Sequence, residues 1–311
     1  MRIGLIDVDG HNFPSIPLMK ISAWHKQNGD SVEWYDPMFS GHMDKVYMSK
    51  VFSFSKDYPY CVDADEVIKG GSGYCINLVD GVEVFDKTKD IQLPHEVEHI
   101  YPDYSIYGIT DTAYGFLTRG CPRGCSFCHV AAKEGQKAYK VANLDEFWNG
   151  QKNIVLCDPN ILACKDWREL LQQLIDSKAY VDINQGLDIR LMTEEKAEML
   201  KRVKMKMLHF AWDRWQDKDI ILPKLQMFKD ITKKNERGLI VYTLCNFDTT
   251  IEQDLERIYK LREMGYWAYI TMYDKEHLPK GHELRKLARW VNNRFIFAKC
   301  KTFEEYKNYE R

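Results

Sequence analysis

Apolar positions in the first part of the chain fall into short runs that polar turns separate. These runs predict buried strands over residues 2–7, 32–35, 45–54 and 66–69. Between the first two strands, apolar positions at helical spacing predict a helix that ends at Asn28-Gly29. Its buried face is formed by Leu18, Ile21, Ala23, Trp24 and His25. Strands that alternate with a helix predict a parallel sheet.

A second run of strands follows, with helices between them. We expect strands at 114–118, 153–157, 180–184, 207–212, 239–244 and 267–272, and a last one at 294–298. One helix has Trp167, Leu170, Leu171 and Leu174 on its inner face; the next begins at Thr193 and buries Ala197, Leu200 and Val203. A third begins with the capping box Thr250 to Gln253, buries Leu255, Ile258 and Leu261, and ends at Gly265.

These patterns predict an α/β protein with two parts. Residues 1–76 are expected to form a flavodoxin-like parallel sheet domain. Residues 77–112 are polar and rich in turns, and we interpret them as a linker. Residues 113–299 contain six strand–helix units, and residues 300–311 form a charged helical tail.

Composition narrows the function classes. The chain has 311 residues, 45% hydrophobic content and a net charge of -2, so nothing indicates a nucleic-acid partner. No apolar stretch approaches membrane-spanning length, and the first residues do not resemble a signal peptide. The nine cysteines are an odd number, and their spacing does not suggest a framework of disulfides. They favour reduced thiols and a cytoplasmic location.

Three of those cysteines lie close together, at the spacing C-x3-C-x2-C. They are Cys121, Cys125 and Cys128, and the glycines and proline among them predict a loop. Three thiolates suit an iron–sulfur cluster, which normally takes four protein ligands, so one iron would stay open to another ligand. The alternative is a structural zinc site with His129 as the fourth ligand, although adjacency to Cys128 gives that histidine poor geometry.

This spacing closely resembles the signature of the radical S-adenosylmethionine enzymes. The resemblance implies that Cys121, Cys125 and Cys128 hold a [4Fe-4S] cluster, and that Phe127 lies against the adenine of S-adenosylmethionine. In that family the open iron binds the cofactor, and one electron cleaves it to methionine and a 5′-deoxyadenosyl radical. The resemblance also implies a partial (β/α)6 barrel of the TIM type, and an electron donor such as flavodoxin or ferredoxin.

The first 76 residues resemble the amino-terminal domain of cobalamin-binding radical S-adenosylmethionine proteins. The triplet Asp9-Gly10-His11 matches the start of their D-x-H-x-x-G motif, but Pro14 stands where glycine is expected. His11 is either a cobalt ligand or a loop histidine bonded to the backbone. We expect a degenerate domain that has kept the fold and lost cobalamin. Residues 70–73, Gly-Gly-Ser-Gly, are either a phosphate cradle or, preferably, a tight turn.

Polar residues follow most strands of the second part, at the edge where barrel enzymes carry their chemistry. The candidates for cofactor contacts are Asp158, Asn160, Gln185, Asp188, Arg190, Asp213 and Asn246. By resemblance, Asp158 and Asn160 replace the family's motif for the methionine amino group. Arg190 suits the methionine carboxylate, since a guanidinium matches a carboxylate; Gln185 and Asp188 suit ribose hydroxyls. The alternative is that such residues only cap helices.

Three functions remain open. The first is a radical S-adenosylmethionine enzyme that abstracts hydrogen from an unknown substrate. The second is a cobalamin-dependent radical methyltransferase, and the third is a non-catalytic module stabilised by zinc. Methylation, methylthiolation, cyclisation and rearrangement share this scaffold, so the sequence does not select a reaction.

Overall fold

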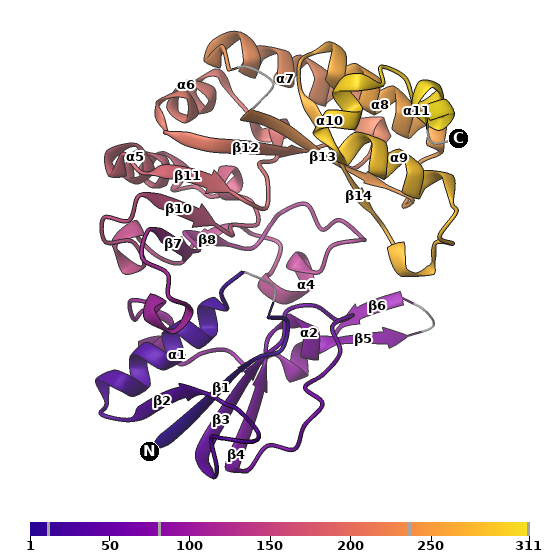
Figure 1. Cartoon of the computed structure of the whole chain (residues 1–311). Coiled ribbons are helices and arrows are strands. Elements are labelled where there is room, and N and C mark those ends of the chain that lie inside the picture. The colour runs from indigo at the N-terminus through magenta and orange to yellow at the C-terminus, as the bar shows by residue number, and fades with distance from the viewer. Residues whose placement is uncertain (11–12, 80–81, 235–237, 310–311) are drawn as a thin grey trace. The chain divides into compact units, whose positions relative to one another are not determined.

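The computed structural model describes residues 1–10, 13–79, 82–234 and 238–309. It is an α/β structure with a four-stranded and a six-stranded parallel sheet (Figure 1). The chain divides into two compact units, Met1–Val155 and Leu156–Arg311, a boundary that falls at the end of one strand of the larger sheet.

The four-stranded sheet contains the first four predicted strands. They are β1 (Arg2–Asp7), β2 (Ser31–Trp34), β3 (Met43–Ser49) and β4 (Ala64–Gly70), in the order β2-β1-β3-β4. All three pairings are parallel. The predicted helix is α1 (Ile16–Gln27), whose Leu18 and Ile21 pack on Ile3 and Leu5 of β1.

The third strand is shorter than its apolar pattern suggests. Residues 51–54 were expected to continue it, but the strand ends at Ser49. There the backbone N–H groups of Val51 and Phe52 donate to the carboxylate of Asp9 instead of to a neighbouring strand. A side-chain acceptor therefore turns the chain out of the sheet, an effect that hydrophobic periodicity does not encode.

The turn after β4 needs glycine. Gly71 has φ 99°, and a Cβ there would lie 2.3 Å from the carbonyl oxygen of Lys50. It precedes the short helix α2 (Ser72–Cys75). This close approach of two backbones accounts for the glycine and favours a tight turn. His11, the candidate cobalt ligand, lies outside the described residues.

The segment interpreted as a linker contains regular structure. Strands β5 (Ile76–Val79) and β6 (Val82–Phe85) pair antiparallel, and the 3₁₀ turn η1 (Lys87–Lys89) follows. The short helix α3 (His95–Glu98) and the turn η2 (Tyr104–Tyr107) come next. Val97 of α3 joins the core under α1, so this segment is anchored to the first sheet.

The six-stranded sheet is in sequence order. Its strands are β7 (Thr112–Gly115), β10 (Asn153–Leu156), β11 (Tyr180–Ile183), β12 (Met205–Ala211), β13 (Leu239–Cys245) and β14 (Trp267–Met272). The six predictions are confirmed, but the first strand splits. After β7 the chain leaves the sheet, and β8 (Thr118–Arg119) pairs antiparallel with β9 (Tyr139–Lys140).

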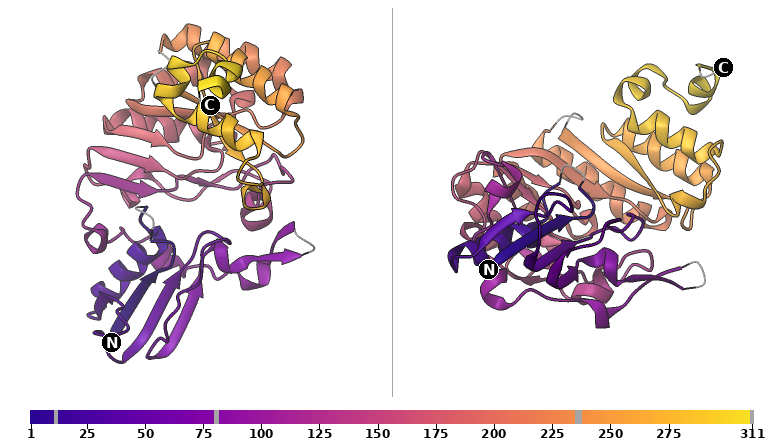
Figure 2. Two further views of the ribbon diagram at one scale, coloured as in Figure 1. Left: turned by 45° about the vertical axis from the view of Figure 1, so that its right-hand side comes forward. Right: turned by 60° about the horizontal axis from the view of Figure 1, so that its bottom comes forward.

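The helices of the second unit are α5 (Trp167–Ser177), α6 (Glu194–Arg202), α7 (Lys218–Thr232), α8 (Ile251–Glu263) and α9 (Glu283–Asn292). Figure 2 shows them alongside the strands, with α6 next to α7. Thr193 and Thr250 cap α6 and α8 as predicted, each accepting a hydrogen bond from a backbone N–H three residues later. Among the described residues, no helix combines the length and apolar character needed to cross a membrane.

The prediction of a last strand at 294–298 is wrong. This stretch is the helix α10 (Arg294–Lys299), because the Asn293 side chain accepts from the N–H groups of Phe295 and Ile296 and so caps a helix. The tail after it forms α11 (Phe303–Tyr309). Its Phe303 and Tyr306 are buried, so the tail belongs to the folded core.

Candidate active site

The three cysteines lie on an irregular loop between β8 and α4 (Val130–Glu134), as the sequence predicts. Cys121 and Cys125 are partly buried, and Cys128 is exposed. The backbone N–H of Cys128 donates to the carbonyl of Cys125 at 3.0 Å, which folds the last turn of the loop. The thiols are therefore displayed on a short segment that solvent reaches.

Glu134, the last residue of α4, fixes the entry to the loop. Its carboxylate accepts from the backbone N–H of Gly120 and from Nη1 of Arg119, both at 2.9 Å. The N–H of Cys121 donates to the carbonyl of Gly135 at 3.2 Å. These bonds join the residues immediately before and after the cysteine segment, so the loop is a closed structure.

Gly120 is required where the loop begins. Its φ is 77°, and a Cβ would lie 2.2 Å from the carbonyl oxygen of Lys137. A side chain at this position would push apart the two ends that Glu134 holds together. The conformation of the loop thus depends on a glycine that the sequence identified only as a turn residue.

The donor set suits an iron–sulfur cluster. Each of the nine cysteines carries a thiol, and three of them lie within eight residues of an accessible loop. Among the described residues, however, no group of three or more His, Cys, Asp or Glu side chains is gathered as a metal site.

His129 is positioned for another partner. Its Nε2 lies 3.2 Å from Oε2 of Glu83, which is on β6. A zinc site of three cysteines and this histidine would have to break that contact, in addition to overcoming the strain of ligation by adjacent residues. In this structure His129 is thus engaged with Glu83.

Lys133 is a feature that the sequence analysis missed. It lies on α4, and its Nζ donates to Oγ of Ser72 at 2.7 Å. Removal from water, and secondarily the positive charge of Arg119, lowers the pKa of Lys133. The sequence around Lys133 gives no sign that it is buried, because its hydrogen-bond partner Ser72 lies on α2, 61 residues away along the chain.

Two candidate residues follow β10 in the second unit. Asp158 has no exposed surface, and Asn160 is 2% exposed. Burying a carboxylate is costly unless hydrogen bonds or charges compensate it. A buried Asp–Pro–Asn turn at a strand end is thus unlike an ordinary surface helix cap, and it remains a candidate ligand site.

Asp188, Arg190 and Asp217 form one charged cluster after β11 and β12. The Nε of Arg190 donates to Asp188 at 2.8 Å, and its Nη1 donates to Asp217 at 2.6 Å. Asp188 also accepts from the backbone N–H of Arg190. The guanidinium is thus already paired with two carboxylates, so binding a ligand carboxylate would require it to exchange partners.

Asp213 follows β12 and belongs to the same electrostatic neighbourhood. Removal from water raises the pKa of Asp213 to about 6, while the positive charges of Arg257 and Arg190 oppose that rise. The structure thus brings Asp188, Arg190 and Asp213 together. A carboxyl group that titrates near neutral pH can hold or release a proton at this strand end.

Gln185 and Asn246 are the remaining two candidates. Gln185 is exposed. Asn246 has φ 68° and donates from its Nδ2 to the carbonyl of Tyr273 at 2.9 Å. That bond connects the ends of β13 and β14, so Asn246 has a clear structural role.

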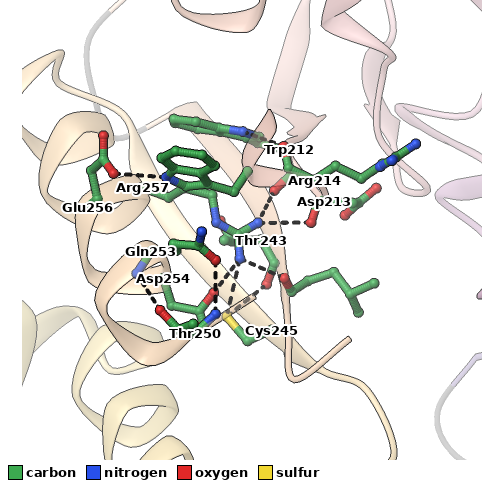
Figure 3. Close-up of polar contacts among 12 residues, drawn as sticks. Trp212, Asp213, Arg214, Thr243, Cys245, Thr250, Gln253, Asp254, Glu256 and Arg257 are labelled. Atoms are coloured by element: carbon green, nitrogen blue, oxygen red, sulfur yellow. Dashed lines mark hydrogen bonds and ion pairs between the residues drawn. The ribbon is translucent and has the colours of Figure 1, made fainter. Parts of the chain in front are cut away.

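Arg257 of α8 is the second feature that the sequence analysis missed (Figure 3). It is completely buried, and it donates to the carbonyl oxygens of Trp212, Asp213 and Leu244. Its charge is paired with Asp254, which is also buried. These contacts hold the ends of β12 and β13 together beside Asp213.

The helical pattern explains why Arg257 was missed. The sequence assigned Leu255, Ile258 and Leu261 to the buried face of α8. Leu255 is only partly buried, and Asp254 and Arg257 occupy fully buried positions instead. Charged residues in a helix are normally assigned to its solvent-exposed face. Only the folded structure shows that Asp254 and Arg257 are buried and paired.

Comparison with models of known protein families found no match, and comparison with curated proteins found no similar sequence.

Proposed function

We propose that this protein is a radical S-adenosylmethionine enzyme. The observation that carries the proposal is the C-x3-C-x2-C segment, which lies on an accessible loop a few residues after β7, the first strand of a six-stranded parallel sheet. Sequence-ordered parallel strands with helices between them are what a partial (β/α)6 barrel contains. The order β2-β1-β3-β4 of the smaller sheet agrees with a flavodoxin-like domain.

In this proposal Cys121, Cys125 and Cys128 hold a [4Fe-4S] cluster. When bound, the cluster supplies the electron that cleaves S-adenosylmethionine, so that the resulting radical abstracts hydrogen from a substrate. The protein's own contribution is to present three thiolates and leave one metal position open. Arg123 lies within the loop, and Arg119 and Lys133 lie on either side of it, so the loop is rich in cationic residues.

Polar strand ends supply the other proposed roles. Asp158 and Asn160 remain candidates for an ammonium group, and Phe127 for the adenine ring. Arg190 and Asp188 remain candidates for carboxylate and hydroxyl contacts, and Gln185 and Asn246 are weaker candidates. Asp213 is the residue best suited to hold or release a proton, since its pKa is raised to about 6.

Anaerobic reconstitution with iron and sulfide tests the cluster assignment. We expect about four irons and four sulfides per chain, because that is the composition of the cluster that cysteine loops of this kind hold. Cys125→Ala should lose most of the bound iron. Cys61→Ala is the matched control, since Cys61 is an exposed thiol outside the loop and its loss should not matter.

Two results would contradict the proposal. Zinc bound stoichiometrically without iron or sulfide would indicate the structural metal site instead. Iron uptake that is the same in Cys125→Ala and in the unaltered chain would remove the loop from the cluster. Cobalamin that remains bound after reconstitution would in turn favour the methyltransferase alternative.

A further inference from the structure

A large pocket in the first unit is lined mostly by residues of the four-stranded sheet and the loops that follow its strands. Its volume is about 880 Å³, within the range of small-molecule sites. Ile6, Asp7 and Val8 at the end of β1 line it, together with Trp34 and Tyr35 at the end of β2. These residues lie at the carboxyl ends of two parallel strands, which is the usual side for a ligand in open parallel sheets.

Aromatic rings line much of the pocket. The six rings are Phe13, Trp34, Tyr35, Tyr58, Tyr107 and Tyr114. They pair edge to face: Phe13 with Tyr114 at 5.2 Å between centroids, and Trp34 with Tyr107 at 5.0 Å. In such a pair the edge of one ring meets the face of the other, so ring faces remain available for a flat ligand.

Hydrogen bonds hold these rings in place. The Tyr107 hydroxyl donates to Asp7 at 2.7 Å and accepts from the backbone N–H of Ser15. The Trp34 indole N–H donates to the carbonyl of Ile106 at 2.8 Å. The wall is therefore preorganised, which reduces the entropy lost when a ligand is bound.

The polar groups of the pocket favour a ligand that donates hydrogen bonds. Asp7 accepts only two hydrogen bonds from described residues, those of Tyr107 and Gly10, and a carboxylate can accept about four. Asp57 lies at the rim, and its hydrogen bonds with Tyr74 and Lys69 outweigh its partial burial and lower its pKa to about 2. Lys69 pairs with Asp57, and Lys56 is the one cation among the described lining residues, so Asp7 is the lining carboxylate that forms no ion pair with a described residue.

The geometry points to a site for a purine nucleoside whose base presents N–H donors, as that of guanosine does. The base stacks between the aromatic walls and donates to Asp7, and the sugar lies toward Asp57 at the rim. The carboxylate of Asp7 would repel a phosphate, so a free nucleoside fits better than a nucleotide. This site is separate from the proposed cluster chemistry and does not require it.

Isothermal titration calorimetry of the full-length protein with guanosine, carried out without oxygen, tests whether the pocket binds a nucleoside. We expect one nucleoside per chain, and weaker binding of guanosine monophosphate. Trp34→Leu should weaken guanosine binding at least tenfold by removing one wall, and Asp7→Asn should weaken it by removing the acceptor charge. Phe39→Leu is the matched control, because Phe39 is 83% exposed and outside the pocket; it should bind guanosine normally.

Further variants test whether nucleoside binding at the pocket is independent of the cysteine loop. A variant with Cys121, Cys125 and Cys128 all replaced by Ala should bind guanosine unchanged, because the pocket contains none of them. Circular dichroism verifies that each variant is folded. Absence of guanosine binding, binding that survives both Trp34→Leu and Asp7→Asn, tighter binding of the monophosphate, or binding of hydroxocobalamin instead of guanosine would overturn the assignment.

Discussion

At the residue scale, Asp213 links the charge of the strand ends to pH. Its pKa is about 6 in the folded chain, above the usual value of 3.8, chiefly because it is removed from water. The folded state therefore holds a proton more tightly than the unfolded state between these two values. The stability that this proton contributes is fully present below about pH 4 and is lost as the pH rises through about 6.

Replacing Asp213 with Asn removes that dependence. Asn cannot ionise, so the variant should be more stable than the unaltered chain at pH 7.5. The gain in unfolding free energy should be about 1.4 kcal/mol smaller at pH 5 than at pH 7.5. This value follows from a pKa of about 6 in the folded state and 3.8 in the unfolded state. Urea denaturation at both pH values measures the difference in unfolding free energy between the variant and the unaltered chain. The same difference at pH 5 and at pH 7.5 would show that the pKa of Asp213 is not raised.

Arg257 is the other residue with a large predicted effect. Arg257→Met leaves the buried carboxylate of Asp254 without its ion-pair partner and removes donors from three carbonyls, so we expect a loss of about 3–5 kcal/mol in unfolding free energy. Arg168→Ala is the matched control, because the Arg168–Glu195 pair is exposed and should contribute under about 1 kcal/mol. Comparable losses in the two variants would be inconsistent with a structural role for Arg257.

Sequence patterns predicted individual residues unevenly. The caps Thr193 and Thr250 were predicted because a cap depends only on the next three residues. The buried pair of Arg257 and Asp254 could not be predicted, because its partners are carbonyls at the ends of two strands distant in sequence. The same holds for Lys133, whose burial depends on α2.

At the element scale, the cysteine loop depends on one glycine. Gly120→Ala combines a positive φ with a Cβ placed 2.2 Å from a carbonyl oxygen. We expect it to destabilise the protein by about 2–4 kcal/mol, since backbone strain alone costs about 1 kcal/mol and a steric clash adds to it. The same variant should lower iron incorporation on reconstitution.

Gly29→Ala separates these two contributions. Gly29 also has a positive φ, 83°, but a Cβ there meets nothing within 4 Å. Its cost in unfolding free energy should be about 1 kcal/mol, and its iron content should not change. Equal thermal and chemical stability of the two variants would mean that the close approach to Lys137 does not constrain the loop.

The elements themselves were largely readable from apolar periodicity. Ten strands and the helices α1, α5, α6 and α8 were predicted near their observed positions, because each buries a regular face, whereas α7 and α9 were not predicted. Residues 294–298 were mistaken for a strand, since Phe-Ile-Phe favours strands until Asn293 caps the segment as a helix. The antiparallel pair β5–β6 was not predicted, because residues 77–112 are rich in turn-forming residues.

At the scale of the whole molecule, the chain carries two chemically different regions. One is a loop of three thiols that follows the first strand of the larger sheet, and the other is an aromatic pocket at the end of β1. Spacing in the sequence indicated the first, because its ligands are close along the chain. The second draws on residues from 5 to 114, so only the folded structure could indicate it.

Formation of 5′-deoxyadenosine tests the central claim most directly. The reconstituted protein is incubated without oxygen with dithionite and S-adenosylmethionine, and the products are separated by chromatography. We predict 5′-deoxyadenosine and methionine from the unaltered chain and from Cys61→Ala, and none from Cys121→Ala, Cys125→Ala or Cys128→Ala. An iron-loaded protein that yields no 5′-deoxyadenosine, or loop variants that yield as much as the unaltered chain, would contradict it.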